Sequence, residues 1–112
     1  MDSPRPREDM PPLHFVVMTT PTALWVHVGG EVDLANVDAL HAKLTAIEFD
    51  GVPAVELDLH RLTFCDSHGA RLLLRFTNLA RLTGHRATIR GATPSTQKLL
   101  RLLAGGDQPV FA

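Results

Sequence analysis

Apolar and polar residues alternate along residues 13–28 and predict two strands that form a hairpin. The turn between the strands falls at Pro21, a residue that favours turns. The apolar positions of the two strands are Leu13, Phe15, Val17, Leu24, Val26 and Val28. We expect Gly29 and Gly30 to end the second strand, because paired glycines are typical of turns.

A helical period replaces this alternation after the diglycine. Asp33 is a favourable N-cap, and the helix extends to the break at Asp50 and Gly51. Its apolar positions are Val37, Leu40, Leu44 and Ile47. A third strand opens at Pro53, and its apolar positions are Val55, Leu57 and Leu59. Polar residues alternate with them, which indicates a strand that is buried on one face only.

The second half of the chain continues the alternation of strands and helices. A short strand over Leu62–Cys65 leads into a helix that ends at Gly84. The apolar stripe of this helix consists of Leu72, Leu73, Phe76, Leu79 and Ala80. Ala87 and Ile89 alternate with polar residues and predict a further strand.

A third helix is predicted from Thr93, which is a suitable N-cap, and Pro94, which suits the first helical position. It ends at Gly105, and its expected buried positions are Leu99, Leu100, Leu102 and Leu103. Val110 and Phe111 then leave room for a short last strand.

This order of elements predicts one α/β domain over residues 13–112, with parallel crossovers after the hairpin. One face of its sheet is expected to be partly solvated, so the helices should lie mainly on the other. The residues expected on the solvated face are Trp25, His27, Glu56, Asp58 and Arg90. Residues 1–12 hold four prolines among charged and small residues, a composition that predicts a flexible tail.

The charge balance limits the kinds of partner. Eleven Lys and Arg residues against twelve Asp and Glu residues give a formal net charge of −1. This argues against a broad nucleic-acid footprint and against a polybasic membrane surface. No stretch approaches the ~18 consecutive apolar residues of a membrane span. With one cysteine and no secretion signal at the start, we expect a cytoplasmic protein.

Motifs for catalysis and metal binding are missing from the sequence. The six histidines do not fall at the spacings typical of metal ligands. Asp66, Ser67 and His68 are the residue types of a hydrolytic triad, but adjacent side chains diverge and cannot form its hydrogen-bond chain. Cys65 ends an apolar strand and is expected to be a small core residue. We therefore expect no enzyme activity, no cofactor and no metal.

The turn before the second helix has two interpretations. Ser67 falls at or beside the helix N-cap, and Asp66 is itself a candidate cap. On the local sequence alone, a capping role is favoured for Ser67. Gly69 removes side-chain cover in the first turn, so that a partner could approach the backbone. A phosphate on Ser67 would meet free N–H groups at the positive end of the helix, which makes this serine a candidate switch.

These segments resemble the STAS domain of bacterial anti-sigma factor antagonists. The segments Leu57–Leu59 and Leu62–Gly69 are followed by a leucine-rich helix, a strand and Thr93–Ser95. Upstream, Gly30–Asp33 resembles that family's Gly-Glu-hydrophobic-Asp turn. The resemblance spans about residues 13–106. It implies a STAS-like mixed sheet of four to five strands with helices mainly on one face, and no catalytic activity.

The resemblance also implies a partner switch controlled by Ser67, which stands at the family's phosphorylatable serine. The unphosphorylated domain would bind a serine kinase that is also an anti-sigma factor, and a sigma factor would be released. Phosphorylation of Ser67 would end this binding, and a serine/threonine phosphatase of the metal-dependent type would restore it. The partner-binding residues that the resemblance implies are Asp33, Asp66, His68, Gly69 and Ala70.

Departures from the family's pattern leave a second function open. His68 stands where a second Ser or Thr is usual, Ala70 stands where a larger aliphatic residue is usual, and the terminal helix of many relatives is missing. The alternative is a STAS module that is never phosphorylated. Such a module would be a structural or regulatory subunit of a larger transporter or signalling assembly.

Overall fold

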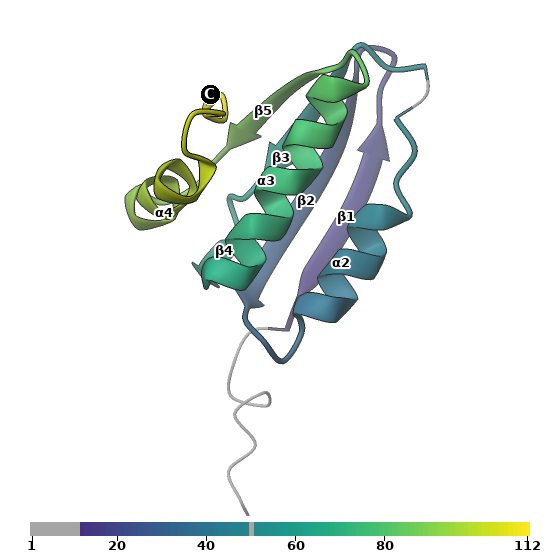
Figure 1. Cartoon of the computed structure of the whole chain (residues 1–112). Helices are drawn as coiled ribbons and strands as arrows, with labels where there is room; N and C mark the ends of the chain where they lie inside the picture. The colour runs from purple at the N-terminus through teal and green to yellow at the C-terminus, as the bar shows by residue number, and fades with distance from the viewer. Residues whose placement is uncertain (1–11, 50) are drawn as a thin grey trace, which may run out of the picture.

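A five-stranded mixed sheet forms the centre of the protein in the computed structural model, which describes residues 12–49 and 51–112. Residues 1–11 of the predicted tail lie outside the described residues. In chain order the elements are β1 (His14–Thr19), β2 (Ala23–Val32), α2 (Val37–Thr45), β3 (Ala54–Asp58), β4 (Leu62–Cys65), α3 (Ser67–Leu82), β5 (Arg86–Arg90) and α4 (Pro94–Ala104) (Figure 1).

The sheet combines one antiparallel hairpin with parallel crossovers. β1 and β2 pair antiparallel, as the alternating pattern predicts. β3 lies parallel to β2, and β5 lies parallel to β3, which gives the order β1-β2-β3-β5. β4 pairs separately with the end of β2. The expected last strand is reduced to a single parallel bridge between Ile89 and Phe111. The α/β fold class with a mixed sheet is confirmed.

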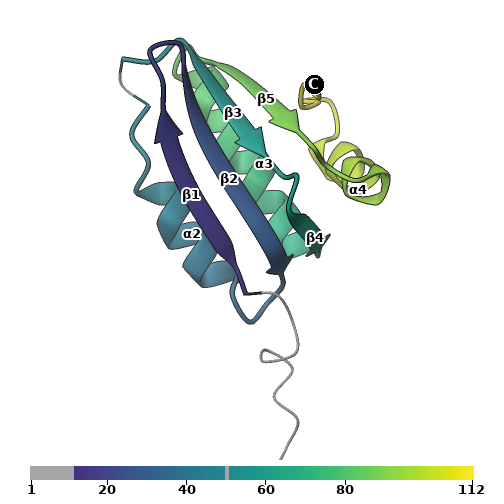
Figure 2. The ribbon, with the colours of Figure 1, turned by 180° about the vertical axis from the view of Figure 1, so that it is seen from behind.

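The helices gather on one face of the sheet, as expected. Figure 1 shows α2 and α3 in front of the strands, and the reverse view in Figure 2 shows the other face without a helix across it. α3 supplies the centre of the core, where Ala70, Leu73 and Ala80 are fully buried. Val55 and Leu57 of β3 are fully buried in the same hydrophobic cluster.

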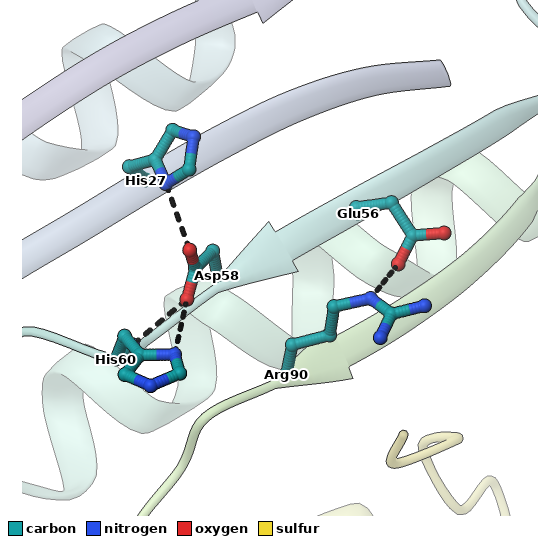
Figure 3. Close-up of polar contacts among 5 residues, drawn as sticks. All are labelled: His27, Glu56, Asp58, His60 and Arg90. Carbon is teal, nitrogen blue, oxygen red and sulfur yellow. Dashed lines mark hydrogen bonds and ion pairs between the residues drawn. The ribbon is translucent and has the colours of Figure 1, made fainter. Parts of the chain in front are cut away.

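The helix-free face is polar, and the residues predicted for it are confirmed there. Trp25, His27, Glu56 and Asp58 are half-buried, and Arg90 is exposed. A hydrogen bond between His27 and Asp58 and an ion pair between Arg90 and Glu56 connect neighbouring strands on this face (Figure 3). Polar side chains therefore bind one another across strands that lack a covering layer.

β2 continues through Gly29 and Gly30 to Val32, so the expected strand end at the diglycine is wrong. β4 pairs with this part of β2, beginning where Gly30 lies opposite Leu62. A side chain at Gly29 would place its Cβ only 2.9 Å from the Cβ of Arg61. Glycine is therefore needed for the close approach of the β3–β4 turn, and not for a chain reversal.

Two leucines expected in the core are exposed instead. Leu79 on α3 is 52% exposed, and Leu102 on α4 is 70% exposed. The buried side of α3 includes Leu74 and Thr77, which the apolar stripe did not contain. On α4, Leu100 is fully buried, and a residue two positions further along a helix faces away from it. Helical spacing thus predicts the elements correctly but not the border of each buried face.

Candidate functional site

β2 and β4 run parallel and end side by side, which brings two aspartates to one edge of the sheet. Val32 and Cys65 are the last paired residues of the two strands. The backbone N–H of Asp66 donates a hydrogen bond of 3.1 Å to the carbonyl oxygen of Val32. Asp33 follows Val32 directly, so the turns that contain Asp33 and Asp66 lie next to each other.

Asp66 is the N-cap of α3. Its Oδ1 accepts a hydrogen bond of 3.0 Å from the backbone N–H of Gly69, and its carbonyl oxygen accepts one of 2.9 Å from Ala70. The first bond satisfies an N–H group that has no backbone partner within the helix, and the second is the first backbone bond of the helix itself. The candidate cap at Asp66 is confirmed. Because the helix starts at the next residue, Asp66 also fixes the position of Ser67.

Ser67 is the first residue of α3 and is half-buried. Its hydroxyl makes no hydrogen bond with any other residue that the structure describes, so the capping role favoured for it on local sequence belongs to Asp66. The first turn of α3 contains no acidic residue. Its N–H groups lie at the positive end of the helix dipole, where an added anion is stabilised. The Ser67 hydroxyl is thus uncommitted and lies where a phosphate would be tolerated.

His68 follows Ser67 in the first turn of α3 and is exposed. Its Nδ1 is 3.6 Å from Oδ2 of Asp66, and its side chain is 55% exposed. A protonated His68 would therefore partly offset the Asp66 carboxylate next to Ser67. Solvent screening at this exposure keeps the attraction weak.

Gly69 and Ala70 lie in the core and not on the surface. A Cβ on Gly69 would lie 2.5 Å from Cγ1 of Val32 and 2.9 Å from Sγ of Cys65. Glycine at this position therefore allows α3 to pack closely on the ends of β2 and β4, and does not expose backbone to a partner. Ala70 is fully buried. Both residues are thus buried and position the helix that carries Ser67.

Asp33 is not the N-cap of α2, so this part of the prediction is wrong. Its Oδ1 accepts a hydrogen bond of 2.9 Å from the N–H of Ala35, and its carbonyl oxygen accepts one of 2.9 Å from Val37. Asn36 occupies the N-cap position without a side-chain cap bond. Asp33 thus stabilises a separate turn before the helix, and α2 ends at Thr45, before the expected Asp50 break.

Two apolar residues near the aspartates were not among the sequence candidates. Leu34, directly after Asp33, is 66% exposed, and Phe64, two residues before Asp66, is 49% exposed. Large apolar side chains exposed beside polar turns are a common feature of protein interfaces. For Leu34 the signal available in the sequence was an apolar residue inside a turn, where burial is not expected, whereas Phe64 lies within β4 and gave no such signal.

Cys65 is a buried core residue, as predicted. Burial, and to a lesser degree the neighbouring Asp66 carboxylate, raises the pKa of the Cys65 thiol from 9.0 to about 12. The reactive thiolate is therefore suppressed near neutral pH. The Cys65 side chain therefore packs in the core at the start of α3 and is not suited to redox signalling.

Within residues 12–49 and 51–112, no group of three or more His, Cys, Asp and Glu side chains could hold a metal ion. In the same part of the chain, no helix combines the length and apolar character needed to cross a membrane.

The fold and this site agree with a comparison against protein families. Residues 15–107 match the family model described as "Mlab, STAS domain". The match covers most of the chain, and the chain therefore belongs to the STAS domain family, as its motifs suggested. A comparison with curated protein sequences gave no match.

Solved structures of anti-sigma factor antagonists are similar to this chain. Unphosphorylated SpoIIAA is 26% identical with a TM-score of 0.66, and the alignment covers 88% of each chain. The phosphorylated form of this Bacillus protein is 25% identical with a TM-score of 0.65, over 88% of this chain and 91% of that chain. An anti-sigma factor antagonist from Mycobacterium paratuberculosis is 22% identical with a TM-score of 0.73, over 89% of this chain and 86% of that chain. At this last identity the likeness is one of fold.

Proposed function

We propose that this protein is an anti-sigma factor antagonist that changes partners according to the phosphorylation of Ser67. In the unphosphorylated form it binds a serine kinase that is also an anti-sigma factor, and a sigma factor is released. Phosphorylation of Ser67 ends the binding, and a serine/threonine phosphatase restores it. The proposal places this exchange in the cytoplasm and assigns no catalytic step to this chain. It rests on one observation, the uncommitted Ser67 hydroxyl on the first residue of α3.

The similar structures support this choice among the functions of STAS domains. SpoIIAA is described as an anti-sigma factor antagonist and is known in an unphosphorylated and a phosphorylated form. A chain of the same fold therefore accommodates a phosphate. In the protein described here, the Ser67 hydroxyl at the capped start of α3 is the position that we propose for a phosphate.

The electrostatics of the helix start explain how a phosphate would act. A phosphoserine carries a charge of about −1.5 to −2 at neutral pH. The N–H groups of the first turn and the helix dipole stabilise this charge while water surrounds it. A docked partner would remove the water, and a buried charge without a partner is costly. The phosphate would thus be tolerated within the free domain and rejected within the complex.

The contact surface that we propose surrounds Ser67. Asp33, Asp66 and His68 supply its polar groups, and Leu34 and Phe64 supply exposed apolar area. Apolar side chains at the centre of an interface and charged groups at its rim are the usual arrangement in protein complexes. A kinase that binds here would have its active site close to the hydroxyl that it modifies.

The test is to co-purify the tagged full chain from its native cells and ask whether an ATP-binding kinase is bound. The recovered complex is then incubated with ATP, and mass spectrometry locates the phosphate. We expect one phosphate, on Ser67, and none in the Ser67→Ala variant. Ser95→Ala is the matched control, because Ser95 also lies in the first turn of a capped helix, α4. Phosphate on Ser95 would exclude Ser67 as the modified residue, and recovery of a stable transporter or signalling assembly without a kinase would favour the structural-subunit function.

A further inference from the structure

The helix-free face of the sheet contains a pocket that the partner switch does not use. It has a volume of about 300 Å³, at the lower end of the range for small-molecule sites. Its polar lining comes from three strands and the β3–β4 turn, and consists of His14, His27, Asp58, His60 and Arg61. Figure 2 shows this face without a covering helix, and Figure 3 shows three of the polar residues.

Asp58 is the only acidic residue in the lining, and both of its carboxylate oxygens are engaged. Oδ2 accepts a hydrogen bond of 2.9 Å from Nδ1 of His27 (Figure 3). Oδ1 accepts one of 2.9 Å from the backbone N–H of His60, whose ring Nδ1 lies 3.5 Å away. Asp58 therefore orients the two histidines and is not available as a ligand for a cation.

The basic groups of the pocket are less committed. Within the described part of the chain, the side chains of Arg61 and His14 make no hydrogen bond or ion pair. By contrast, Arg90 on the same face is bound to Oε1 of Glu56 at 2.7 Å. His27 uses only Nδ1, and its ring stacks on Trp25 with the centroids 6.0 Å apart. The pocket thus combines an unpaired guanidinium with imidazole nitrogens that have no partner among the described residues.

We propose that this pocket binds a small phosphate monoester. The Arg61 guanidinium supplies several N–H donors and the unpaired His14 ring supplies a further one, which suits the three terminal oxygens of a phosphate. Inorganic phosphate alone would leave much of the volume empty. Val16 and Val28 line the remainder and suit an organic group on the phosphate.

The test is a titration of the full chain with phenyl phosphate, inorganic phosphate and phenol, followed through backbone amide NMR shifts. We expect saturable shifts at Gly29 and Arg61 with phenyl phosphate, weaker binding of inorganic phosphate and none of phenol. The absence of saturable binding, or shifts confined to residues 67–70 at the start of α3, would overturn the proposal.

Variants separate the two recognition elements. Arg61→Gln should weaken phenyl phosphate binding about tenfold, since it removes a charge-assisted contact. His14→Ala should weaken binding by a smaller factor, because it removes a neutral donor. Arg75→Gln is the matched control, because Arg75 is an exposed arginine on the helical side of the protein. Unchanged affinity in Arg61→Gln, or an equal loss in Arg75→Gln, would contradict the assigned site.

Discussion

The backbone N–H of Asp66 donates a hydrogen bond of 3.1 Å to the carbonyl oxygen of Val32. This bond connects the end of β2 to the residue that caps α3. The side chain of Val32 packs closely against the backbone of α3 at Gly69. One strand end therefore fixes both the cap of the helix and the depth at which the helix packs. The position of Ser67 depends on these two contacts.

The first prediction concerns this packing. Gly69→Ala should destabilise the protein by about 1 to 3 kcal/mol, because the new Cβ would lie 2.5 Å from Cγ1 of Val32. Gly106→Ala is the control, since a Cβ there meets no atom within 4 Å. Urea denaturation of both variants measures the free energy of unfolding. Equal stability of the two variants would show that the helix start can shift without cost.

Local sequence predicts those parts of the fold that depend on neighbouring residues. The strand Leu62–Cys65 and the Thr93 cap of α4 were both predicted from the local sequence, and both are confirmed. Gly29 was misassigned to a turn because its requirement for glycine comes from Arg61, which lies on a different strand connection. Local pattern contains no information about such a contact.

The same distinction applies to the candidate site. Asp66 could be identified as a cap from the residues that follow it, whereas the inward orientation of Gly69 depends on Val32 and Cys65. The exposure of Leu34 was not predicted because hydrophobicity alone gives no direction to a side chain in a turn. The local sequence therefore predicted the Asp66 cap, while the division of the candidate site into surface and core residues required the fold.

The second prediction concerns the cap of α3. Asp66→Ala should cost about 1 kcal/mol of stability, because the N–H of Gly69 loses its acceptor. Asp66→Asn should retain most of this stability, since the amide oxygen can accept the same bond. Thr93→Ala, which removes the equivalent cap of α4, gives the comparison within the same protein. Denaturation curves check the order, and an Asn variant as unstable as the Ala variant would mean that charge and not the hydrogen bond is required.

The third prediction concerns alkaline pH. The raised pKa of Cys65, about 12, means that the folded protein retains the thiol proton after the unfolded chain has released it near pH 9. The unfolded state then binds fewer protons, so the free energy of unfolding falls as the pH rises from about 9 towards 12. Below that range the contribution of Cys65 to stability does not change with pH.

The Cys65→Ala variant isolates this contribution. Urea denaturation at about pH 7.5, 9 and 10.5 should show the stability advantage of the natural protein over the variant shrinking with pH. Other groups titrate equally in both proteins and cancel in the difference. An advantage that stays constant up to pH 10.5 would contradict a protonated, buried thiol.

The last prediction measures the switch itself. Phosphorylation of Ser67 should weaken binding of the co-purified kinase by more than a hundredfold, which corresponds to a loss of about 3 kcal/mol. The loss arises because binding would remove water from the phosphate, which in the free domain is stabilised by water and by the start of α3.

Ser67→Ala should bind like the unphosphorylated protein and resist modification. Ser67→Asp carries about half the charge of a phosphate and should bind weakly. Titration calorimetry gives the four affinities, and Ser95→Asp controls for an added charge at another helix start. Equal affinity of the phosphorylated and unphosphorylated proteins would exclude a switch at Ser67 and leave the structural-subunit function as the better account.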